Sequence, residues 1–185
     1  MLIKTVQRSR GFTLVELLVV IAIVAILAAV VLLVINPAEI QSRGRDSSRL
    51  ADLANLNNAI STAVTESDGN TEAVLCDGGT YPCGGLSHVD GRGNDGSGWV
   101  KVDLSQGSLR LPTLYVDPTN DAAYHFAYCA DNDTYELNAV LESDKERGRM
   151  NEDGGDQNAL DETGRYEVGS ALNLITATSV APCAY

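Results

Sequence analysis

Glu16 is the residue of this sequence that most clearly needs a polar or positively charged partner. It is the only charged residue among residues 12–35, where every other side chain except that of Thr13 is apolar. A carboxylate in a lipid-exposed helix costs about 2.5–3.5 kcal/mol near the bilayer centre and much less near the surface. The electropositive N-terminus of a helix offsets part of that cost. Glu16 is therefore either a glutamate at the membrane surface or the partner of a positive group inside the apolar layer.

The peptide bond between Gly11 and Phe12 could supply that positive group. Cleavage after Gly11 would give Phe12 a free α-amino group, four residues before Glu16 in the chain. If several copies packed side by side with a stagger, the amine of one copy could meet the Glu16 carboxylate of a neighbour. Proteolytic processing and assembly would then be two steps of one mechanism.

The rest of the sequence offers little catalytic chemistry. His88 and His125 are the only histidines, and no nucleophile stands in a recognisable pattern with a base. The glycine-rich stretches are acidic and lack the lysine of a phosphate-binding loop. The sequence therefore predicts a protein that is not an enzyme and requires no cofactor.

The charge of the chain is unevenly distributed. The formal net charge is −12, and from Glu66 onward 21 acidic residues stand against 7 basic ones. A surface of this kind repels the phosphates of nucleic acids, so no direct nucleic-acid binding is expected. It suits an exposed head that attracts cations.

Residues 12–35 are long enough to cross a membrane as a helix. At 1.5 Å per residue they span about 36 Å, against roughly 30 Å for the hydrocarbon core of a bilayer. The basic residues before them predict a cytoplasmic N-terminus and a head on the other side. A cleaved secretory signal peptide fits poorly, because its apolar run is about 7–15 residues and ends at a small-residue site. A plain single-span anchor explains the length and the flanking charges, but not the residues from Gly11 to Glu16.

A second helical segment is predicted over residues 37–66. Pro37 disfavours helical geometry at Asn36, so a kink or short break is expected between the two segments. The second segment is amphipathic. Its apolar positions recur at helical spacing, and the charged positions are expected on the other face. The apolar positions are Leu50, Leu53, Leu56, Ile60 and Val64, and the charged ones are Arg43, Arg45, Arg49 and Asp52.

The remaining residues predict loops around a small antiparallel sheet. Residues 67–98 are rich in Gly, Asp, Asn and Ser and predict a long loop. Alternating apolar residues predict strands over 99–104, 124–129 and 135–141, with a four-residue hairpin loop over 130–133. Residues 142–164 predict a second, acidic loop. Residues 171–175 form a short apolar run that can return to the sheet, within a C-terminal region of residues 165–185. The amphipathic helix is expected to cover the apolar face of the sheet, which gives an α+β fold.

Four cysteines lie in the part of the chain after the apolar segment. Cys76, Cys83, Cys129 and Cys183 are an even set, and disulfides are the natural expectation if this part lies outside the cytoplasm. Four unpaired thiols remain the alternative for a cytosolic protein. The spacing does not resemble a zinc site. Three disulfide pairings are open on the residues alone.

The sequence around the apolar segment resembles that of a known family. Residues 10–18 (RGFTLVELL) and the apolar run after them resemble the prepilin cleavage and methylation motif of type IV pilins and type II secretion pseudopilins. The similarity is close over residues 8–35 and looser to about residue 65. Beyond that only the layout matches: helix, loop, antiparallel sheet and a C-terminus fixed by cysteines.

The resemblance implies a role for each residue of the motif. Gly11 would precede the bond cut by a prepilin peptidase, which would also methylate the new amino group of Phe12. Residues 1–11 would be a removed leader. Glu16 would take the family's role in subunit recruitment and register. One departure is Pro37, because the family commonly has a helix-kinking proline a few residues earlier.

The resemblance also implies a fold, a function and partners. The fold would be the type IV pilin fold, with a long N-terminal helix and a small C-terminal antiparallel sheet. The function would be that of a structural subunit of a pilus-like filament for adhesion, motility or DNA uptake. A secretion pseudopilin and a monomeric, single-span membrane-anchored binding protein are the alternatives. The partners would be other copies in a helical filament, a prepilin peptidase, the membrane and an inner-membrane assembly platform. The precursor would lie in the cytoplasmic membrane, and the assembled filament at the cell surface or in the periplasm.

Two further sites are expected in the head. Of the three disulfide pairings, the resemblance favours Cys76–Cys83, which closes a short loop, and Cys129–Cys183, which ties a strand to the tail as in the pilin C-terminal disulfide region. Major pseudopilins carry a C-terminal calcium loop, and carboxylate oxygens are ligands that Ca²⁺ prefers. The acidic loop here could bind Ca²⁺ through Glu152, Asp153, Asp156 and Asp161, with a solvated loop as the alternative.

Overall fold

The structure is a computed structural model that describes residues 11–154, 164–176 and 183–184. The chain divides into two compact units, Met1–Ile40 and Gln41–Tyr185. The first contains helix α1, Leu14–Ile35, and the start of helix α2, Pro37–Glu66. The second contains the rest of α2 and the head. The amphipathic helix therefore folds mostly as part of the head rather than as a separate segment.

The break between the two helices lies at Asn36, as the sequence predicts. Asn36 closes α1 in the left-handed region with φ 36°, and Pro37 then begins α2. The Asn36 side chain accepts a hydrogen bond from the Glu39 backbone N–H at 3.5 Å, which caps the new helix. Pro37 fits the first turn of a helix because its missing N–H would have no intrahelical partner there.

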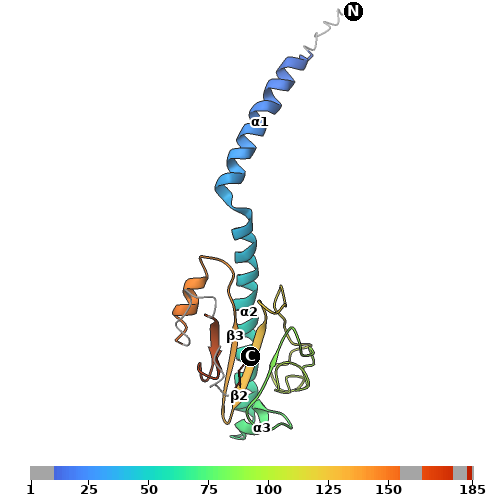
Figure 1. Cartoon of the computed structure of the whole chain (residues 1–185). Coiled ribbons are helices and arrows are strands. Elements are labelled where there is room, and N and C mark those ends of the chain that lie inside the picture. The colour runs from blue at the N-terminus through green and yellow to red at the C-terminus, as the bar shows by residue number, and fades with distance from the viewer. Residues whose placement is uncertain (1–10, 155–163, 177–182, 185) are drawn as a thin grey trace, which may run out of the picture. The chain divides into compact units, whose positions relative to one another are not determined.

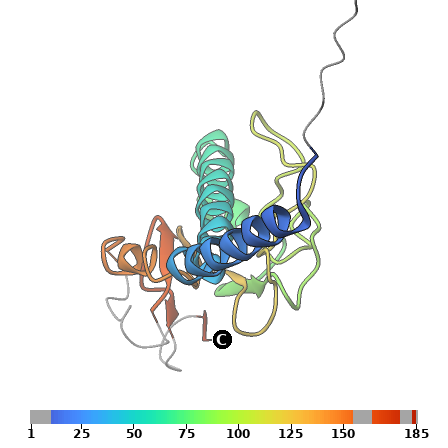
Figure 2. The ribbon, with the colours of Figure 1, turned by 90° about the horizontal axis from the view of Figure 1, so that it is seen from above.

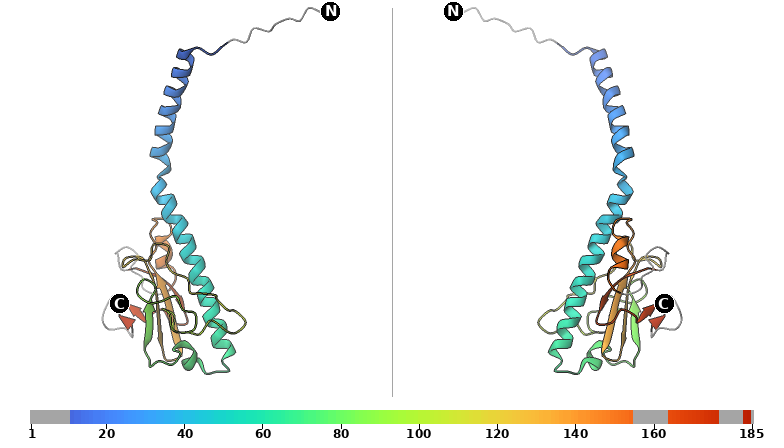
Figure 3. Two further views of the ribbon diagram at one scale, coloured as in Figure 1. Left: turned by 90° about the vertical axis from the view of Figure 1, so that its right-hand side faces the viewer. Right: turned by 90° about the vertical axis from the view of Figure 1, so that its left-hand side faces the viewer.

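The head is built on a four-stranded antiparallel sheet that lies along α2 (Figures 1 and 3). The strands pair in the order β1, β2, β3, β4. Their bounds are Cys83–Leu86, Phe126–Asp131, Thr134–Ala139 and Tyr166–Gly169. Helix α3, Thr71–Leu75, precedes the sheet, and the 3₁₀ helix η1, Arg147–Asn151, precedes β4. Two short strands, β5 (Ile175–Thr176) and β6 (Cys183–Ala184), pair in parallel.

Both faces of the central strands are buried. On one face Phe126, Tyr128 and Leu137 pack with the buried side of α2, which includes Leu53 and Leu56. The opposite face carries a smaller apolar cluster, in which C-terminal residues cover the sheet: Ala127, Cys129, Leu174, Ile175 and Cys183. The expected sheet with one covered face is therefore a sheet covered on both. In Figures 1 and 2, η1 and the loops between β1 and β2 lie on opposite sides of α2.

The prediction of a strand over residues 99–104 is wrong. Trp99, Val100, Val102 and Leu104 are all buried, but the only ladder pairing of this described segment is an isolated bridge between Asp95 and Asp103. Its backbone bonds instead to scattered loop carbonyls, such as Trp99 N–H to Gly91 at 3.0 Å and Leu104 N–H to Asn94 at 2.6 Å. The alternation of apolar residues correctly predicted which side chains are buried. The backbone N–H groups, however, bond to carbonyls of the loop rather than to a neighbouring strand.

Other strand limits also differ from those expected. The first strand of the sheet is β1, which lies inside the segment expected to be a loop, as does α3. The hairpin has a two-residue turn, Asn132 and Asp133, in place of four, and Asn132 takes the required positive φ of 53°. The strand that returns to the sheet is β4 and not the run over residues 171–175.

β1 contains Gly84 and Gly85, and a Cβ at Gly85 would lie 2.5 Å from the Trp99 carbonyl oxygen. Glycine at that position therefore lets the loop pack directly on the strand.

The structure contains two disulfides, in the pairing that the sequence favours. Cys76 is bonded to Cys83, which closes the loop between α3 and β1. Cys129 is bonded to Cys183, which ties the central strand β2 to β6. The second bond closes a separation of 54 residues and holds the C-terminal segment on the outer face of the sheet.

Candidate functional site

The bond expected to be cut lies in an open, non-helical segment. Gly11, Phe12 and Thr13 precede α1 without helical structure, and the Phe12 side chain is 81% exposed. An added Cβ at Gly11 would meet no atom within 4 Å. A peptidase needs an accessible chain, and Gly11 and Phe12 are exposed and not helical.

Thr13 and Glu16 form a reciprocal cap at the start of α1. The Glu16 backbone N–H donates to the Thr13 hydroxyl oxygen at 3.2 Å. The Glu16 carboxylate in turn accepts from the Thr13 backbone N–H at 2.9 Å and from its hydroxyl at 2.7 Å. Together they satisfy two N–H groups that would otherwise have no intrahelical partner. Glu16 therefore lies folded over the first turn of the helix.

The side chains of α1 have almost no apolar cover from their own chain. Every described large apolar residue from Leu14 to Val31 is at least 47% exposed. Over Leu14–Val31 the helix is long and apolar enough to cross a membrane, and it is the only such helix among the described residues. A surface like this requires lipid or other protein chains around it.

A comparison with known families decides what this N-terminus is. The family model described as the prokaryotic N-terminal methylation motif matches residues 6–32. The chain carries this motif. The motif marks precursors of type IV pilins and pseudopilins, which prepilin peptidase processes. No curated protein and no solved structure matches the chain.

The match covers the residues that carry the N-terminal chemistry. Gly11, Phe12, Thr13 and Glu16 all lie inside it, whereas Pro37 and the whole head lie outside. The motif therefore indicates a precursor of the type IV pilin-like or pseudopilin kind, and the apolar helix is long enough to anchor such a precursor in a membrane. The roles of the individual residues in cleavage, methylation and assembly remain predictions.

The predicted calcium site falls partly outside the described residues. Asp156 and Asp161 lie there, and only Glu152 and Asp153 can be placed. One Asp153 carboxylate oxygen accepts the Glu167 backbone N–H at 3.0 Å. Within the described part of the chain, no group of three or more His, Cys, Asp and Glu side chains is arranged to hold a metal. Calcium binding therefore remains a prediction.

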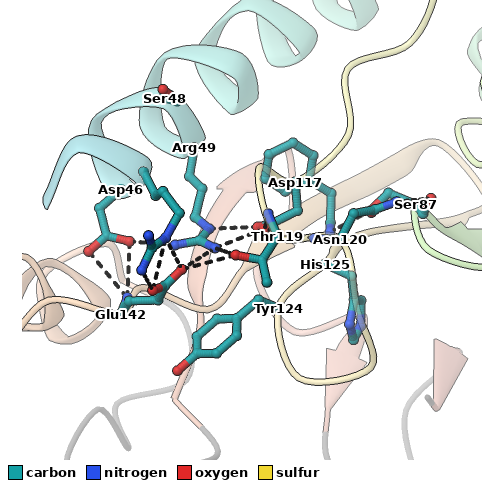
Figure 4. Close-up of polar contacts among 12 residues, drawn as sticks. Asp46, Ser48, Arg49, Ser87, Asp117, Thr119, Asn120, Tyr124, His125 and Glu142 are labelled. Atoms are coloured by element: carbon teal, nitrogen blue, oxygen red, sulfur yellow. Dashed lines mark hydrogen bonds and ion pairs between the residues drawn. The ribbon is translucent and has the colours of Figure 1, made fainter. Parts of the chain in front are cut away.

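The head contains a buried cluster of charged side chains that the sequence did not lead us to expect. Arg49 was expected on the solvent face of α2, and this expectation is wrong, because its side chain is fully buried. Its guanidinium binds Asp117 through two hydrogen bonds of 2.6 and 2.8 Å and Asp46 through one of 2.8 Å (Figure 4). Glu142 lies 2.5 Å from the same guanidinium.

The cluster joins three parts of the chain. Asp46 and Arg49 come from α2, Asp117 from the loop before β2, and Glu142 from the loop after β3 (Figure 4). Asp46 also accepts the backbone N–H groups of Glu142 and Ser143, at 2.8–3.2 Å. A single guanidinium thus ties the helix to the segments that enter and leave the central hairpin.

The cluster is electrostatically matched. Burial opposes the charge of Arg49, but its hydrogen bonds to Asp117 and Glu142 outweigh burial and raise its pKa. Hydrogen bonds from Arg45 and Arg49 lower the pKa of Glu142 to about 2, against the opposing effect of burial. The Arg49 guanidinium also lies 5.2 Å from the centre of the Tyr124 ring, which favours a cation. Arg49 and Glu142 therefore stay charged over the physiological pH range.

The sequence did contain a signal for this cluster. Asp46 and Arg49 continue the spacing of Leu53, Leu56 and Ile60 toward the N-terminal end of α2. They therefore lie on the same helix face as the core residues. Charged residues on the apolar face of a helix indicate a buried ion cluster, with partners that have to come from elsewhere in the chain. Nothing in the sequence identified Asp117 and Glu142 as those partners.

Arg49→Met tests the cluster. It leaves three carboxylates without their buried cation and should lower the free energy of unfolding by about 3–5 kcal/mol. Arg45→Met is the matched control, because Arg45 also binds Glu142 but is 36% exposed, and it should cost at most about 1 kcal/mol. Urea unfolding of the full chain in detergent, followed by fluorescence of the single tryptophan Trp99, measures both. Equal losses in the two variants would contradict the assignment.

A pair of histidines lies beside this cluster. The rings of His88 and His125 have centroids 4.4 Å apart, and the Asp121 carbonyl lies 3.1 Å from Nδ1 of His125. Burial lowers the pKa of His125, and the positive charge of Arg165 and the neighbouring His88 lower it further. Asp117 and the Asp121 carbonyl act in the opposite direction without reversing the shift.

The head should lose stability as the pH falls below about 6.5. Because the pKa of His125 is lower in the folded state, the unfolded chain takes up the proton first, and acid favours unfolding. Glu136 acts in the opposite sense at lower pH, because burial raises its pKa. Urea unfolding at about pH 7.5 and about pH 5.5 should show the loss in the wild type and a smaller one in His125→Phe. An unchanged difference in the variant would assign the pH dependence to another group.

Proposed function

We propose that the chain is a structural subunit of a type IV pilus-like filament, which polymerises through its N-terminal helix. The observation that carries this proposal is the exposed surface of α1, which is apolar except at its capped first turn. Burial of apolar surface is worth about 25 cal/mol per Å², whichever medium covers it. A helix that moves from the membrane into the core of a filament exchanges contacts with lipid for contacts with other helices. The free energy of this exchange can therefore be close to zero.

Cleavage supplies the group that makes this exchange specific. Removal of residues 1–11 gives Phe12 an α-amino group, and Glu16 is the only carboxylate in the apolar segment. The pairing of these groups between copies would place each subunit at one register on its neighbour. Repeated contacts between two different surface patches of identical copies generate a helical filament when successive copies are related by a screw rotation that does not close into a ring.

The head favours a filament that works outside the cell. Both disulfides suit an oxidising compartment, and the part of the chain from Glu66 onward is strongly acidic. In this arrangement the N-terminus faces the cytoplasm, and an inner-membrane platform recruits the processed subunit. The filament serves adhesion, motility or DNA uptake. A calcium site at residues 152–161 would instead favour a secretion pseudopilin.

N-terminal sequencing of sheared surface filaments tests the processing step. The mature protein should begin at Phe12 with a methylated amino group, because Gly11 precedes the expected cut. Gly11→Leu is the matched control: no neighbouring atom restricts this position in the structure, so only processing should fail. A mature filament protein that retains Met1 would contradict the proposal.

Glu16→Ala tests the assembly step. The variant should be cut and methylated normally, since Gly11 and Phe12 are unchanged. Filament yield should fall about tenfold or more, because the Phe12 amine would be buried without its partner. Glu39→Ala, a change just outside the apolar span, is the control and should assemble. A normal yield from Glu16→Ala would remove Glu16 from the mechanism.

A further inference from the structure

A buried carboxylate on the outer face of the sheet binds the backbone of the C-terminal segment. Glu136 of β3 is fully buried, and its Oε2 accepts the backbone N–H groups of Leu174 and Ile175 at 2.7 and 3.1 Å. The side-chain amide of Asn138 donates to Oε1 at 3.4 Å. Burial raises the pKa of Glu136, and the hydrogen bonds from Ile175 and Leu174 act against that shift. The bound segment therefore favours the ionised carboxylate, whose hydrogen bonds are about twice as strong as neutral ones.

The two residues that Glu136 binds also position Cys183. The Cys183 backbone N–H donates to the Leu174 carbonyl oxygen at 3.2 Å, and Ile175 pairs with Cys183 where β5 runs parallel to β6. Cys183 is bonded in turn to Cys129 of β2. A continuous series of contacts thus leads from the Glu136 carboxylate through the backbone of Leu174 and Ile175 to the sulfur of Cys183.

The two disulfides differ in how far apart their cysteines lie along the chain. Cys76–Cys83 spans 7 residues and Cys129–Cys183 spans 54. The loss of chain entropy on closing a loop grows with the length of the loop. Cys83 packs against the core cluster shared with α2, whereas Cys129 and Cys183 belong to the cluster on the outer face of the sheet. The longer bond therefore depends on a fold that holds Cys183 on the outer face.

We propose that Glu136 is a positioning residue for the Cys129–Cys183 disulfide, because its carboxylate docks residues 174 and 175 on the sheet and so brings the Cys183 thiol to Cys129. In the oxidation the two thiols lose two protons and two electrons, which an external disulfide takes up to become two thiols. Glu136 takes no part in this exchange. It raises the effective concentration of one thiol at the other, since the docked segment has already lost the freedom that loop closure removes. This role does not depend on whether the chain forms filaments.

Equilibration of the full chain in detergent with reduced and oxidised glutathione tests the proposal. Alkylation of free thiols followed by peptide mass spectrometry gives the oxidised fraction of each cysteine pair. Glu136→Leu removes the acceptor and should lower the equilibrium constant for the Cys129–Cys183 bond about tenfold or more. Glu136→Gln keeps one side-chain oxygen as a neutral acceptor and should lower it only about threefold. The Cys76–Cys83 bond is the internal control and should be unchanged in both variants.

Amide hydrogen exchange of the fully oxidised protein measures the docking itself. The Leu174 and Ile175 amides should be protected in the wild type, because both donate to a buried carboxylate. In Glu136→Leu both amides should exchange about tenfold faster, even though the Cys129–Cys183 bond is intact. A change in the exchange of these two amides separates docking from the presence of the disulfide.

The outcomes distinguish positioning from a general effect on stability. An unchanged equilibrium constant for Cys129–Cys183 in Glu136→Leu overturns the proposal, and so does unchanged exchange of the two amides. Equal shifts of both disulfides also overturn it, because Glu136 would then serve the stability of the whole head. If the fluorescence of Trp99 shows that Glu136→Leu does not fold, Glu136→Gln decides. A shift confined to Cys129–Cys183 supports the proposal, and equal shifts or no shift contradict it.

Discussion

The rest of the structure depends on one constraint: α1 is a helix with an exposed apolar surface. Exposure of such an apolar surface to water is unfavourable, so the helix needs contact with lipid or with other helices both before and after assembly. The head has its own core, to which α2 contributes Leu53, Leu56 and Ile60. α1 thus remains available for contacts outside the chain.

The buried ion cluster joins α2 to the segments on either side of the central hairpin. Arg49 binds Asp117 before β2 and Glu142 after β3, so the joint reaches both strands of the central hairpin. A buried cluster of charges adds little net stability, but the loss of one member is costly because the others are left buried without a partner. The apolar contacts further along α2 pack the helix on the sheet, and the ion cluster joins it to the segments on either side of the hairpin.

The sequence predicted the elements that follow from a local pattern of residues. The predictions failed where a residue's contacts come from distant parts of the chain. Both helices, the break at Asn36 and the antiparallel hairpin follow from apolar spacing and from Pro37. The strand expected over residues 99–104 failed because alternation reports burial, and Trp99 is buried by a loop that supplies its own hydrogen bonds. Arg49 was misjudged because its partners lie 68 and 93 residues further along the chain. The N-terminal motif was read correctly because its chemistry lies within six consecutive residues.

Arg49 and Glu16 show how the same physical rule has opposite results at the two ends of this chain. Arg49 lies in an apolar core, and Asp46, Asp117 and Glu142 satisfy it from within the fold. Glu16 lies in an apolar helix, and its carboxylate hydrogen bonds with described residues all go to Thr13, through one oxygen. A charge in an apolar environment needs a full set of partners. Where the chain supplies all of these partners, as for Arg49, the charge stabilises the fold. Where a partner can come from another copy of the chain, as proposed for Glu16, the charge can determine which surface binds.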